Sequence, residues 1–396
     1  MSKLKKDKFS ELYSMASGIS SKPEQAGHGT PFLTFSNVFN NFFVPDTLTN
    51  LMDTSEREQE VYSIKKGDIF LTRTSETINE LAMSCVALND YPQATYSGFV
   101  KRLRPLQDNI TYEKYMGFYL RSKFFRKTMT NNAVLTLRAS LNEEIYSYLN
   151  LYLPEFENQK KIGDFLLLIN DKITLNNRIN TELEAMAKTL YDYWFVQFDF
   201  PNNEGKPYKS SGGKMVWSED LKREIPVGWE VKDLSNVIEI KYGKDHKKLD
   251  FGSIPVYGSG GIMRYADKAL YDKESILIPR KGTLSNLFYL NKPFWSVDTM
   301  FFSKMKIENI GKYLFYYLHS LNLASLNAGT AVPSLTTEIL NQLKIAVPSS
   351  NILKGFDDIL TPAFEMKEQN IKENQQLATL RDWLLPILMN GQVVVE

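Results

Sequence analysis

The chain has 396 residues, 43% of them hydrophobic and 13% aromatic, a composition typical of a globular protein with two or three domains. Its single cysteine, Cys85, excludes an internal disulfide and a cysteine-cluster zinc site, and three isolated histidines argue against a histidine metal site. No apolar run approaches the ~20 residues needed to cross a bilayer, and the basic start is not followed by the apolar region of a signal peptide. We therefore expect a cytoplasmic protein without a membrane partner.

The net charge of +1 conceals a division of charge along the chain. Residues 1–153 carry +2 and residues 226–347 carry +4, whereas residues 154–199 and 348–396 carry −3 each. Basic and acidic segments therefore alternate, and each kind occurs twice.

The sequence also repeats itself. SLNEEIYSYLNLYLP at 140–154 matches SLTTEILNQLKIAVP at 334–348 with an offset of 194, KYMGFYLRS at 114–122 matches KYLFYYLHS at 312–320, and KGDIFLTR at 66–73 matches KESILIPR at 273–280. Offsets that drift from 194 to 207 indicate two copies with different loop insertions. We interpret the chain as a duplication of about 190 residues.

Each copy has the same predicted order of elements. A turn-rich lobe of short strands comes first, and in the second copy the strands are IEIKYG, IPVYG, SILIPR, FYLNKPFWSV and FFSKMKI. A helix follows at 114–127 or 312–325, then a strand that ends in proline, then about forty helical residues. The predicted segments are a first lobe at 1–153, a central helical arm at 154–200, a linker at 201–225, a second lobe at 226–347 and a C-terminal helical arm at 348–396.

Both arms carry a heptad repeat, which predicts a coiled-coil seam. The first arm places Ile162, Ile169, Asn176, Leu183 and Leu190 seven apart, and the second places Phe356, Ala363, Asn370, Leu377 and Leu384 seven apart. Asparagine recurs at the same central position, where it can fix the register of two helices that cross there. The alternative is two amphipathic helices that each pack on their own lobe.

Three local features qualify this description of the arms. Pro362 lies inside the second arm, so we expect that helix to start, break or kink there, with 363–389 as its continuous part. The polar, Gly/Ser-rich stretch NNEGKPYKSSGGKM at 202–215 is typical of a linker. The aromatic stretch LYDYWFVQFDF at 190–200 either caps the first arm against its own lobe or forms a docking surface, and own-core packing is the preferred interpretation.

Catalytic signatures are missing from the sequence. It contains no G-x-x-x-x-G-K-[ST], G-x-G-x-x-G, H-E-x-x-H or G-x-S-x-G motif, and no Asn/Asp-Pro-Pro-aromatic motif of amino-methyltransferases. GSGG at 258–261 does not open a clean helix. We therefore expect a non-catalytic chain without a metal site or cofactor of its own.

Basic and aromatic clusters in the lobes are the remaining candidates for function. Arg and Lys neutralise phosphates and contact guanine edges, and glycine allows close backbone approach. Surface lysines and loop glycines are common in any protein, so only their recurrence in both lobes favours DNA. The candidate DNA-binding residues are Arg73, Thr74, Lys101, Arg102, Arg104, Lys244, His246, Lys247, Tyr257, Ser259, Arg264, Arg280, Lys281 and Thr283.

Forty helical residues span about 60 Å, so two antiparallel arms could hold two lobes at a fixed separation. A spacing of about one turn of duplex is what a two-part DNA reader requires. Acidic arms and basic lobes suit this arrangement, because only the lobes would face phosphate.

These stretches resemble the specificity (S) subunit of type I restriction-modification systems over essentially the whole chain. The resemblance is carried by IPVGWEVKDLSNV, IPVYGSGGI with SILIPRKGT, NNRINTELEAMAKTLYDYWFVQFDF and KENQQLATLRDWLLPILMNGQV. It implies an α+β fold in which two similar mixed α/β target recognition lobes are separated by two long helices pairing as an antiparallel coiled coil. Each lobe would read one half of a split, asymmetric double-stranded DNA target.

The resemblance also implies the partners. Two modification (methyltransferase) subunits would dock beside the helices, bind S-adenosylmethionine and methylate adenine, and restriction (motor/nuclease) subunits would use ATP, with magnesium also expected on partner subunits. The first lobe departs from the pattern, because it lacks the Pro-x-Gly-Trp opening and has RTS where the second has RKG. The two half-sites should therefore differ. The competing hypotheses are a self-sufficient nuclease or solitary methyltransferase with a cryptic site, and a coiled-coil interaction protein that binds no nucleic acid.

Overall fold

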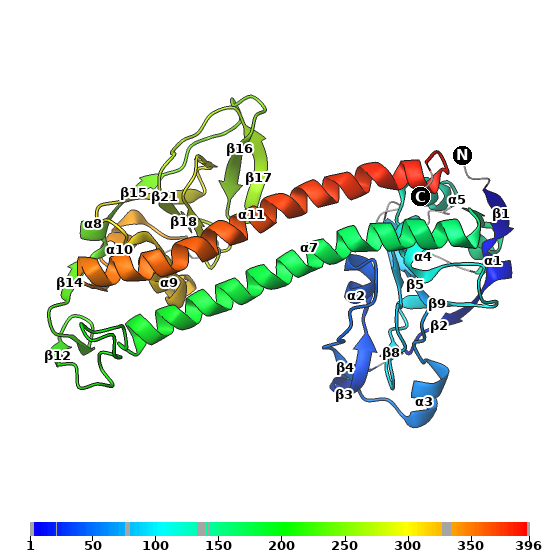
Figure 1. Ribbon diagram of the computed structural model, residues 1–396, viewed down its shortest axis with the longest axis horizontal. Coiled ribbons are helices and arrows are strands. Elements are labelled where there is room, and N and C mark those ends of the chain that lie inside the picture. The colour runs from blue at the N-terminus through cyan, green and yellow to red at the C-terminus, as the bar shows by residue number, and fades with distance from the viewer. Residues whose placement is uncertain are drawn as a thin grey trace. The chain divides into compact units, whose positions relative to one another are not determined.

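The computed structural model describes residues 4–20, 22–75, 80–132, 139–140, 143–326 and 334–393, and for residues 74–75, 132, 139–140 and 143–145 it describes the backbone alone. The chain forms two compact units, residues 1–177 with 371–396 and residues 178–370. Each unit combines one lobe with part of each of the two long helices, α7 and α11 (Figure 1).

The first lobe is built around a four-stranded antiparallel sheet. Its order is β2(Tyr13–Ser17), β9(Val100–Pro105), β5(Ile69–Thr72) and β7(Ser84–Val86). A second sheet has the order β4(Leu51–Met52), β3(Ala26–Leu33) and β8(Thr95–Tyr96), and β3 pairs with β8 in parallel. Two further antiparallel pairs are β1(Lys5–Lys8) with β11(Asn150–Leu153), and β6(Thr74–Ser75) with β10(Ala139–Ser140).

The second lobe repeats this topology. Its four-stranded antiparallel sheet is β15(Ile238–Tyr242), β21(Met300–Met305), β18(Ser275–Pro279) and β19(Phe288–Leu290). Its three-stranded sheet is β17(Gly261–Ala266), β16(Ile254–Gly258) and β20(Trp295–Ser296), and β16 pairs with β20 in parallel. The pair β14(Glu230–Asp233) with β22(Lys344–Val347) matches β1 with β11. The same strand order in both lobes confirms the predicted duplication.

Short helices complete the lobes. The first lobe has α1(Phe9–Leu12), η1(Pro23–Gln25), α2(Phe35–Asn40), α3(Glu56–Val61), α4(Glu113–Tyr119), α5(Lys123–Asn132) and α6(Glu143–Tyr148). The second has α8(Leu234–Val237), α9(Gly311–Ser320), η4(Leu323–Leu326) and α10(Thr337–Asn341). The predicted helix at 114–127 is therefore two helices, and the predicted helix at 312–325 is α9 followed by a short 3₁₀ turn. None of the described helices is long and apolar enough to cross a membrane.

The long helices are α7(Phe156–Tyr191), which continues as a π-helical turn, η3(Asp192–Val196), and α11(Ser350–Met389). At the lobe end of the first unit, the seam residues Ile162 and Ile169 on α7 are buried, and Ile162 packs in the same core as Leu385 and Leu388 of α11. In the second unit, Phe356 and Leu360 of α11 are fully buried with the second lobe. The helix ends thus pack on the lobes.

Between these ends the two helices contact each other, and the contacts are polar. Asn176 is 1% exposed and donates hydrogen bonds of 2.9 Å to the Asn374 amide oxygen and 2.7 Å to Glu373 in the first unit. In the second unit, Asn370 donates a hydrogen bond of 2.9 Å to Asn180. As the residue number rises on α7, that of its partner on α11 falls, so the two helices are antiparallel in both units.

The expectation that the helices cross at Asn176 and Asn370 is wrong in detail. Asn176 pairs with Asn374 and Asn370 pairs with Asn180, so each partner lies one helical turn from the asparagine that was expected there. An offset of 194 residues converts one pair into the other. The remaining seam residues, Leu183, Leu190, Leu377 and Leu384, are half-buried, as expected for a pair of helices that share a narrow stripe with water on both sides.

The prediction that the second arm starts or breaks at Pro362 is also wrong, because α11 is continuous from Ser350 to Met389. Proline removes one helical hydrogen bond at a cost of about 3 kcal/mol. Pro362 lies on the exposed side, and the freed carbonyl four residues earlier belongs to exposed Asp358. Burial of Phe356 and Leu360 on the other side offsets the cost.

The aromatic stretch packs inside the chain, but not on the lobe that we expected. Trp194, Phe195 and Phe198 are buried in the core of the second unit, and Phe195 lies with its ring centroid 4.8 Å from that of Phe356. The predicted linker is structured at its ends. Tyr208 stacks on Phe200 at 4.7 Å, and β12(Met215–Ser218) pairs with β13(Arg223–Pro226).

Candidate nucleic-acid interface

Four loops meet at one end of the main sheet of the second lobe, and we call them the second loop cluster: residues 242–250, 258–261, 280–286 and 296–299. Backbone hydrogen bonds join them, from Lys244 N–H to the Ser296 carbonyl at 2.9 Å and from Arg280 N–H to the Thr299 carbonyl at 2.8 Å. The Asn286 side chain donates to the Ser259 carbonyl at 2.9 Å. The cluster thus collects the ends of β15, β16 and β18 and the start of β21.

Gly243 allows the closest of these approaches. A Cβ atom at this position would lie 2.0 Å from the Val297 carbonyl oxygen, a distance that no side chain tolerates. The glycine therefore lets the loop after β15 lie directly against the β20–β21 turn, where Lys244 N–H reaches the Ser296 carbonyl at the end of β20.

Arg280 is held in a defined orientation in the second loop cluster. Its guanidinium lies 5.4 Å from the centroid of the Tyr242 ring, and one of its nitrogens donates to the Asp298 carbonyl at 3.2 Å. Tyr242 is 51% exposed. An arginine that stacks on an exposed ring keeps its remaining donors available for a ligand such as a guanine edge or a phosphate.

Exposed side chains surround Arg280. Lys244, Lys247, Lys281 and Thr283 are all exposed, and no acidic partner is described for these three lysines. The second loop cluster therefore carries several exposed cations, and exposed Asp245, Asp250 and Asp298 lie in the same loops.

Four of the predicted residues of the second lobe are buried or half-buried. Tyr257 is 7% exposed and packs on Phe288, and burial raises the pKa of its hydroxyl to about 12, so it cannot contact DNA in this conformation. Arg264 is half-buried and donates to the Leu249 carbonyl at 2.7 Å, which fixes the loop after β15. His246 is half-buried. Ser259 is half-buried under Gly282.

The first lobe repeats three of these four loops, which we call the first loop cluster: residues 17–20, 73–75 and 96–99. Ile19 N–H donates to the Tyr96 carbonyl at 2.9 Å, and Arg73 N–H donates to the Phe99 carbonyl at 2.9 Å, in place of the Lys244 and Arg280 bonds of the second lobe. Gly18 takes the place of Gly243, since a Cβ there would lie 2.2 Å from the Ser97 carbonyl oxygen. The two lobes thus share this local structure as well as their topology.

Two of the predicted DNA-binding residues of the first lobe, Arg102 and Arg104, have partners inside the lobe. Arg104 forms a two-pronged ion pair with fully buried Asp68, at 2.8 and 2.6 Å, and also donates to the Ser63 carbonyl at 2.9 Å. The hydrogen bond to Asp68 raises the pKa of Arg104. Arg102 is 9% exposed and donates to the Ser63 carbonyl at 2.8 Å. Both guanidinium groups therefore stabilise the lobe internally.

The other first-lobe candidates differ in accessibility. Arg73 is exposed in the first loop cluster. Lys101 is half-buried and donates to the Ser17 hydroxyl at 2.7 Å, within the same region. The Thr74 side chain lies outside the described residues. Of the first-lobe predictions, only Arg73 and Lys101 are placed at the loop cluster with described side chains.

Some residues of the clusters were missed by a search for basic residues. Phe99 is 67% exposed in the first loop cluster, and Tyr242 is 51% exposed in the second. The sequence contained a signal for Phe99. This residue follows Gly98 and directly precedes Val100, the first residue of a strand. Because neighbouring strand residues point to opposite faces, an apolar residue beside buried Val100 is not required by the core.

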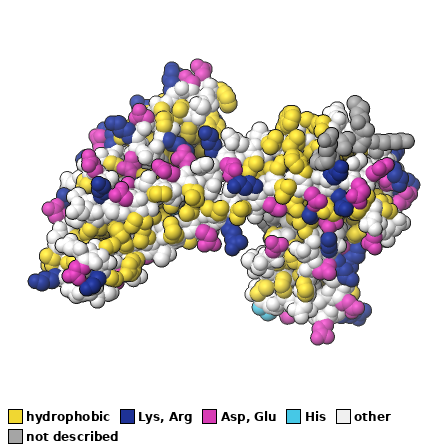
Figure 2. Space-filling view, in the orientation of Figure 1, with side chains coloured by type: hydrophobic (Ala, Val, Ile, Leu, Met, Phe, Trp, Pro, Cys, Tyr) yellow, Lys and Arg dark blue, Asp and Glu magenta, His cyan; other side chains and the backbone are white. Residues whose placement is uncertain are grey.

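Catalytic or metal chemistry finds little support elsewhere. In the part of the chain that the structure describes, no three His, Cys, Asp or Glu residues are arranged to hold a metal ion. Burial raises the pKa of Cys85 to about 12, which keeps this thiol protonated and inert as a nucleophile. On the face shown in Figure 2, basic and acidic side chains are interspersed, so that face presents no continuous acidic or basic surface.

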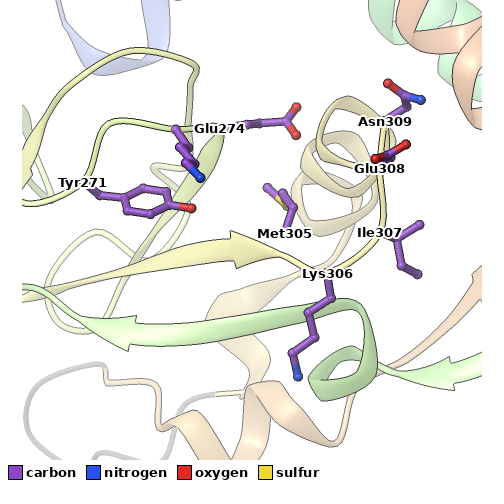
Figure 3. Close-up of a pocket in the computed structure, with 8 residues that line it drawn as sticks. Tyr271, Glu274, Met305, Lys306, Ile307, Glu308 and Asn309 are labelled. Carbon is purple, nitrogen blue, oxygen red and sulfur yellow. The ribbon is translucent and has the colours of Figure 1, made fainter.

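A shallow pocket of about 370 Å³ lies at the opposite end of the second lobe's sheet, beside the start of β18 and the end of β21. In Figure 3, Tyr271 and Glu274 line one side, Ile307, Glu308 and Asn309 line the other, and Met305 lies between them. Burial raises the pKa of Glu274, which accepts a hydrogen bond of 2.6 Å from the Tyr289 hydroxyl. This carboxyl is committed to a structural contact, and no serine, threonine, cysteine or histidine is among the lining residues.

Comparison with known proteins identifies the family to which the chain belongs. A family model described as the type I restriction modification DNA specificity domain matches residues 10–185 and 226–377, well over half of the chain. The chain is 24% identical over 401 residues to the type I restriction enzyme MjaIX specificity subunit of Methanocaldococcus jannaschii, which covers 94% of this chain and 89% of that protein. It is 23% identical over 439 residues to the HindI specificity subunit of Haemophilus influenzae, with 91% and 94% covered.

A solved structure has the same fold. The crystal structure of a type I restriction-modification S subunit from M. genitalium matches with a TM-score of 0.64 at 15% identity, over 98% of this chain and 96% of that one. The family model matches the chain in two segments, each beginning in one lobe and extending into the helix that follows. The chain therefore belongs to the specificity subunits of type I restriction-modification systems, the non-catalytic component that recognises DNA.

Proposed function

We propose that this chain reads a split and asymmetric DNA target, with one lobe on each half-site. The observation that carries the proposal is the repeated loop cluster. Both lobes build it with the same backbone hydrogen bonds and the same close-approach glycine, Gly18 or Gly243, yet they place different side chains on it. A common scaffold with different exposed residues is suited to reading two different sequences.

The long helices would set the distance between the half-sites. α7 has 36 residues and α11 has 40, so they are about 54 and 60 Å long at 1.5 Å per residue. Both helices contribute to both compact units. Two continuous helices that pair through asparagines resist sliding, because a shift of one turn leaves buried amides unpaired.

The same chain would act as a scaffold. We propose that it assembles in the cytoplasm with two modification subunits, which bind S-adenosylmethionine and methylate adenine, and with restriction subunits that use ATP and magnesium. The relatives that carry this proposal are specificity subunits of type I restriction enzymes. The chain itself would contribute recognition and no chemical step.

The test is to express the chain with its modification subunits in a host without other adenine methylation and to map the methylated adenines. A split motif is expected. Replacing residues 226–347 with the second lobe of a relative should change one half of the motif and preserve the other. A change in both halves would contradict reading by separate lobes, and turnover by the purified chain alone would favour a self-sufficient enzyme instead.

A further inference from the structure

Phe99 is the most exposed aromatic side chain of the first loop cluster, with 67% of its surface accessible. Single exposed apolar residues are common on proteins and require no explanation by themselves. The position of Phe99 is what distinguishes it, because it lies on a turn that both lobes use to join β8 to β9 or β20 to β21.

The turn that carries Phe99 is rigid. Gly98 N–H donates to the Ile19 carbonyl at 2.7 Å, and Val100 N–H donates to the Ser97 carbonyl at 2.9 Å. The Phe99 N–H donates to the Ser97 hydroxyl at 3.3 Å, and its carbonyl accepts from Arg73 N–H at 2.9 Å. A ring on such a turn can be presented to a ligand at little cost in backbone entropy.

The corresponding residue of the second lobe is Thr299. Its carbonyl accepts from Arg280 N–H at 2.8 Å, as the Phe99 carbonyl accepts from Arg73. In the second loop cluster the backbone N–H groups of Arg280 and Lys281 both donate to the Thr299 carbonyl, at 2.8 and 3.2 Å, so two cationic residues lie directly beside this position. Phe99 therefore stands where the second lobe would meet DNA.

The first loop cluster is poorer in available cations. Arg73 is its exposed cation with a described side chain, and Lys101 beside it is half-buried and donates to the Ser17 hydroxyl at 2.7 Å. A loop cluster that presents an exposed phenylalanine beside one exposed arginine is suited to apolar contact with a base edge. The methyl group of thymine in the major groove is the base feature that a phenylalanine side chain reads.

On the basis of the proposed function, we infer that Phe99 is a specificity-determining residue of the first lobe and that it contacts a thymine methyl group in the half-site which that lobe reads. Arg73, on the adjacent strand end, would contact the neighbouring phosphate or base edge. Recognition by the two lobes would then differ in kind, with apolar contact dominant in the first and cationic contact in the second.

The experiment compares three variants of the full chain in complex with its modification subunits: Phe99→Ala, Phe99→Leu and Tyr148→Ala. Tyr148 is the matched control, because its side chain is also 67% exposed but lies far from the loop cluster. The neighbouring Leu149 carbonyl accepts a hydrogen bond from Phe9 N–H, which places Tyr148 at the other end of the sheet. Binding is measured on the mapped target and on targets in which each thymine of the first-lobe half-site is replaced by uracil, which removes only the methyl group.

We expect Phe99→Ala to weaken binding of the target about tenfold, because the apolar surface that the ring buries on DNA is lost, and Phe99→Leu to restore part of this loss. One uracil substitution should weaken wild-type binding about fourfold and leave binding by Phe99→Ala unchanged. Tyr148→Ala should behave as wild type in every arm.

The inference would be overturned if Phe99→Ala bound the target as tightly as wild type does. It would also be overturned if Phe99→Ala bound more weakly but no uracil substitution weakened binding by wild type. Thermal unfolding of each variant shows whether a loss reflects misfolding, and Phe99→Leu gives a second readout in that case. A wild-type complex that does not prefer its mapped target over random DNA would instead refute the proposed function, so the two failures are distinguishable.

Discussion

Asn370 on α11 donates a hydrogen bond of 2.9 Å to the side-chain oxygen of Asn180 on α7, where Asn180 is 9% exposed. The equivalent bond in the other unit joins Asn176 to Asn374. These paired amides occupy seam positions that leucine would fill with greater stability, so their role is to set the register.

Replacing one member of the pair should therefore cost more than replacing both. Asn180→Leu leaves the Asn370 amide without its partner in a partly buried seam, and we expect a loss of about 1–3 kcal/mol in the free energy of unfolding. The double variant Asn180→Leu/Asn370→Leu should recover this loss. Urea denaturation measures both, with Gln369→Leu as an exposed control on α11. A double variant that is less stable than either single variant would contradict the role in register.

Arg104 should matter for folding of the first lobe. Arg104→Ala leaves the fully buried Asp68 carboxylate without its ion-pair partner, and we expect a loss of about 3 kcal/mol. Arg73→Ala, at an exposed position of the same lobe, should change stability by less than about 0.5 kcal/mol. Denaturation of the purified chain without DNA measures both. Equal stability of the two variants would show that the Asp68 contact contributes little.

Lys281 should contribute through phosphate. If it neutralises one phosphate, Lys281→Ala reduces the slope of log K against log salt concentration by about 1. The control is Lys273→Ala, an exposed lysine at the pocket end of the same sheet. Binding titrations over several salt concentrations give the slopes. An unchanged slope for Lys281→Ala would place this side chain away from the DNA backbone.

The spacer between half-sites should follow the length of the helices. Inserting seven residues into both α7 and α11 preserves the heptad phase and adds about 10 Å, or about three base pairs. Methylation mapping should then return the same half-sites with a longer spacer. Identical spacing in the parent and the insertion variant would eliminate the helices as the ruler.

The stability of the second lobe should depend on the ionisation of Glu274. Burial raises the pKa of this carboxyl, so the folded state holds its proton more tightly than the unfolded state does. This contribution to stability is present below the ordinary carboxyl pKa and is lost as the pH rises through the raised value. Glu274→Gln mimics the protonated form, and its Tm relative to wild type should therefore increase between pH 4.5 and pH 7.

Glu308→Gln is the control for this comparison, because Glu308 lines the same pocket from an exposed position. Its Tm difference from wild type should be the same at both pH values. A parallel shift in both variants would mean that net charge, and not burial of Glu274, causes the effect.

The sequence predicted the parts of the fold that depend on period and repetition. The strands β15, β16 and β18 lie where short apolar segments around Ile240, Val256 and Leu277 predict them. The two long helices lie where the heptad repeats predict them. Continuity through Pro362 could not be predicted from propensity, because it depends on how deeply Phe356 and Leu360 are buried in the lobe.

The candidate site was predicted less completely, for a physical reason. The sequence alone does not show whether an arginine in a strand binds a phosphate or a buried carboxylate. Arg104 binds Asp68, which lies 36 residues away in the sequence, so this ion pair becomes visible only in the folded lobe. Likewise Trp194 packs with Phe356, which is distant in sequence. Phe99 was missed because the search was for charge, whereas its position becomes meaningful only when the turn is matched to that of the second lobe.

Gly18 and Gly243 have a practical consequence for altering what this protein recognises. Both glycines must stay unchanged, because any larger residue at either position would drive apart two strand ends. Neighbouring residues such as Lys244, Thr283 and Phe99 are exposed and can vary without this steric constraint. A combinatorial library should hold both glycines invariant and randomise only those outward positions. New sequence preferences could then be selected from a framework that still folds.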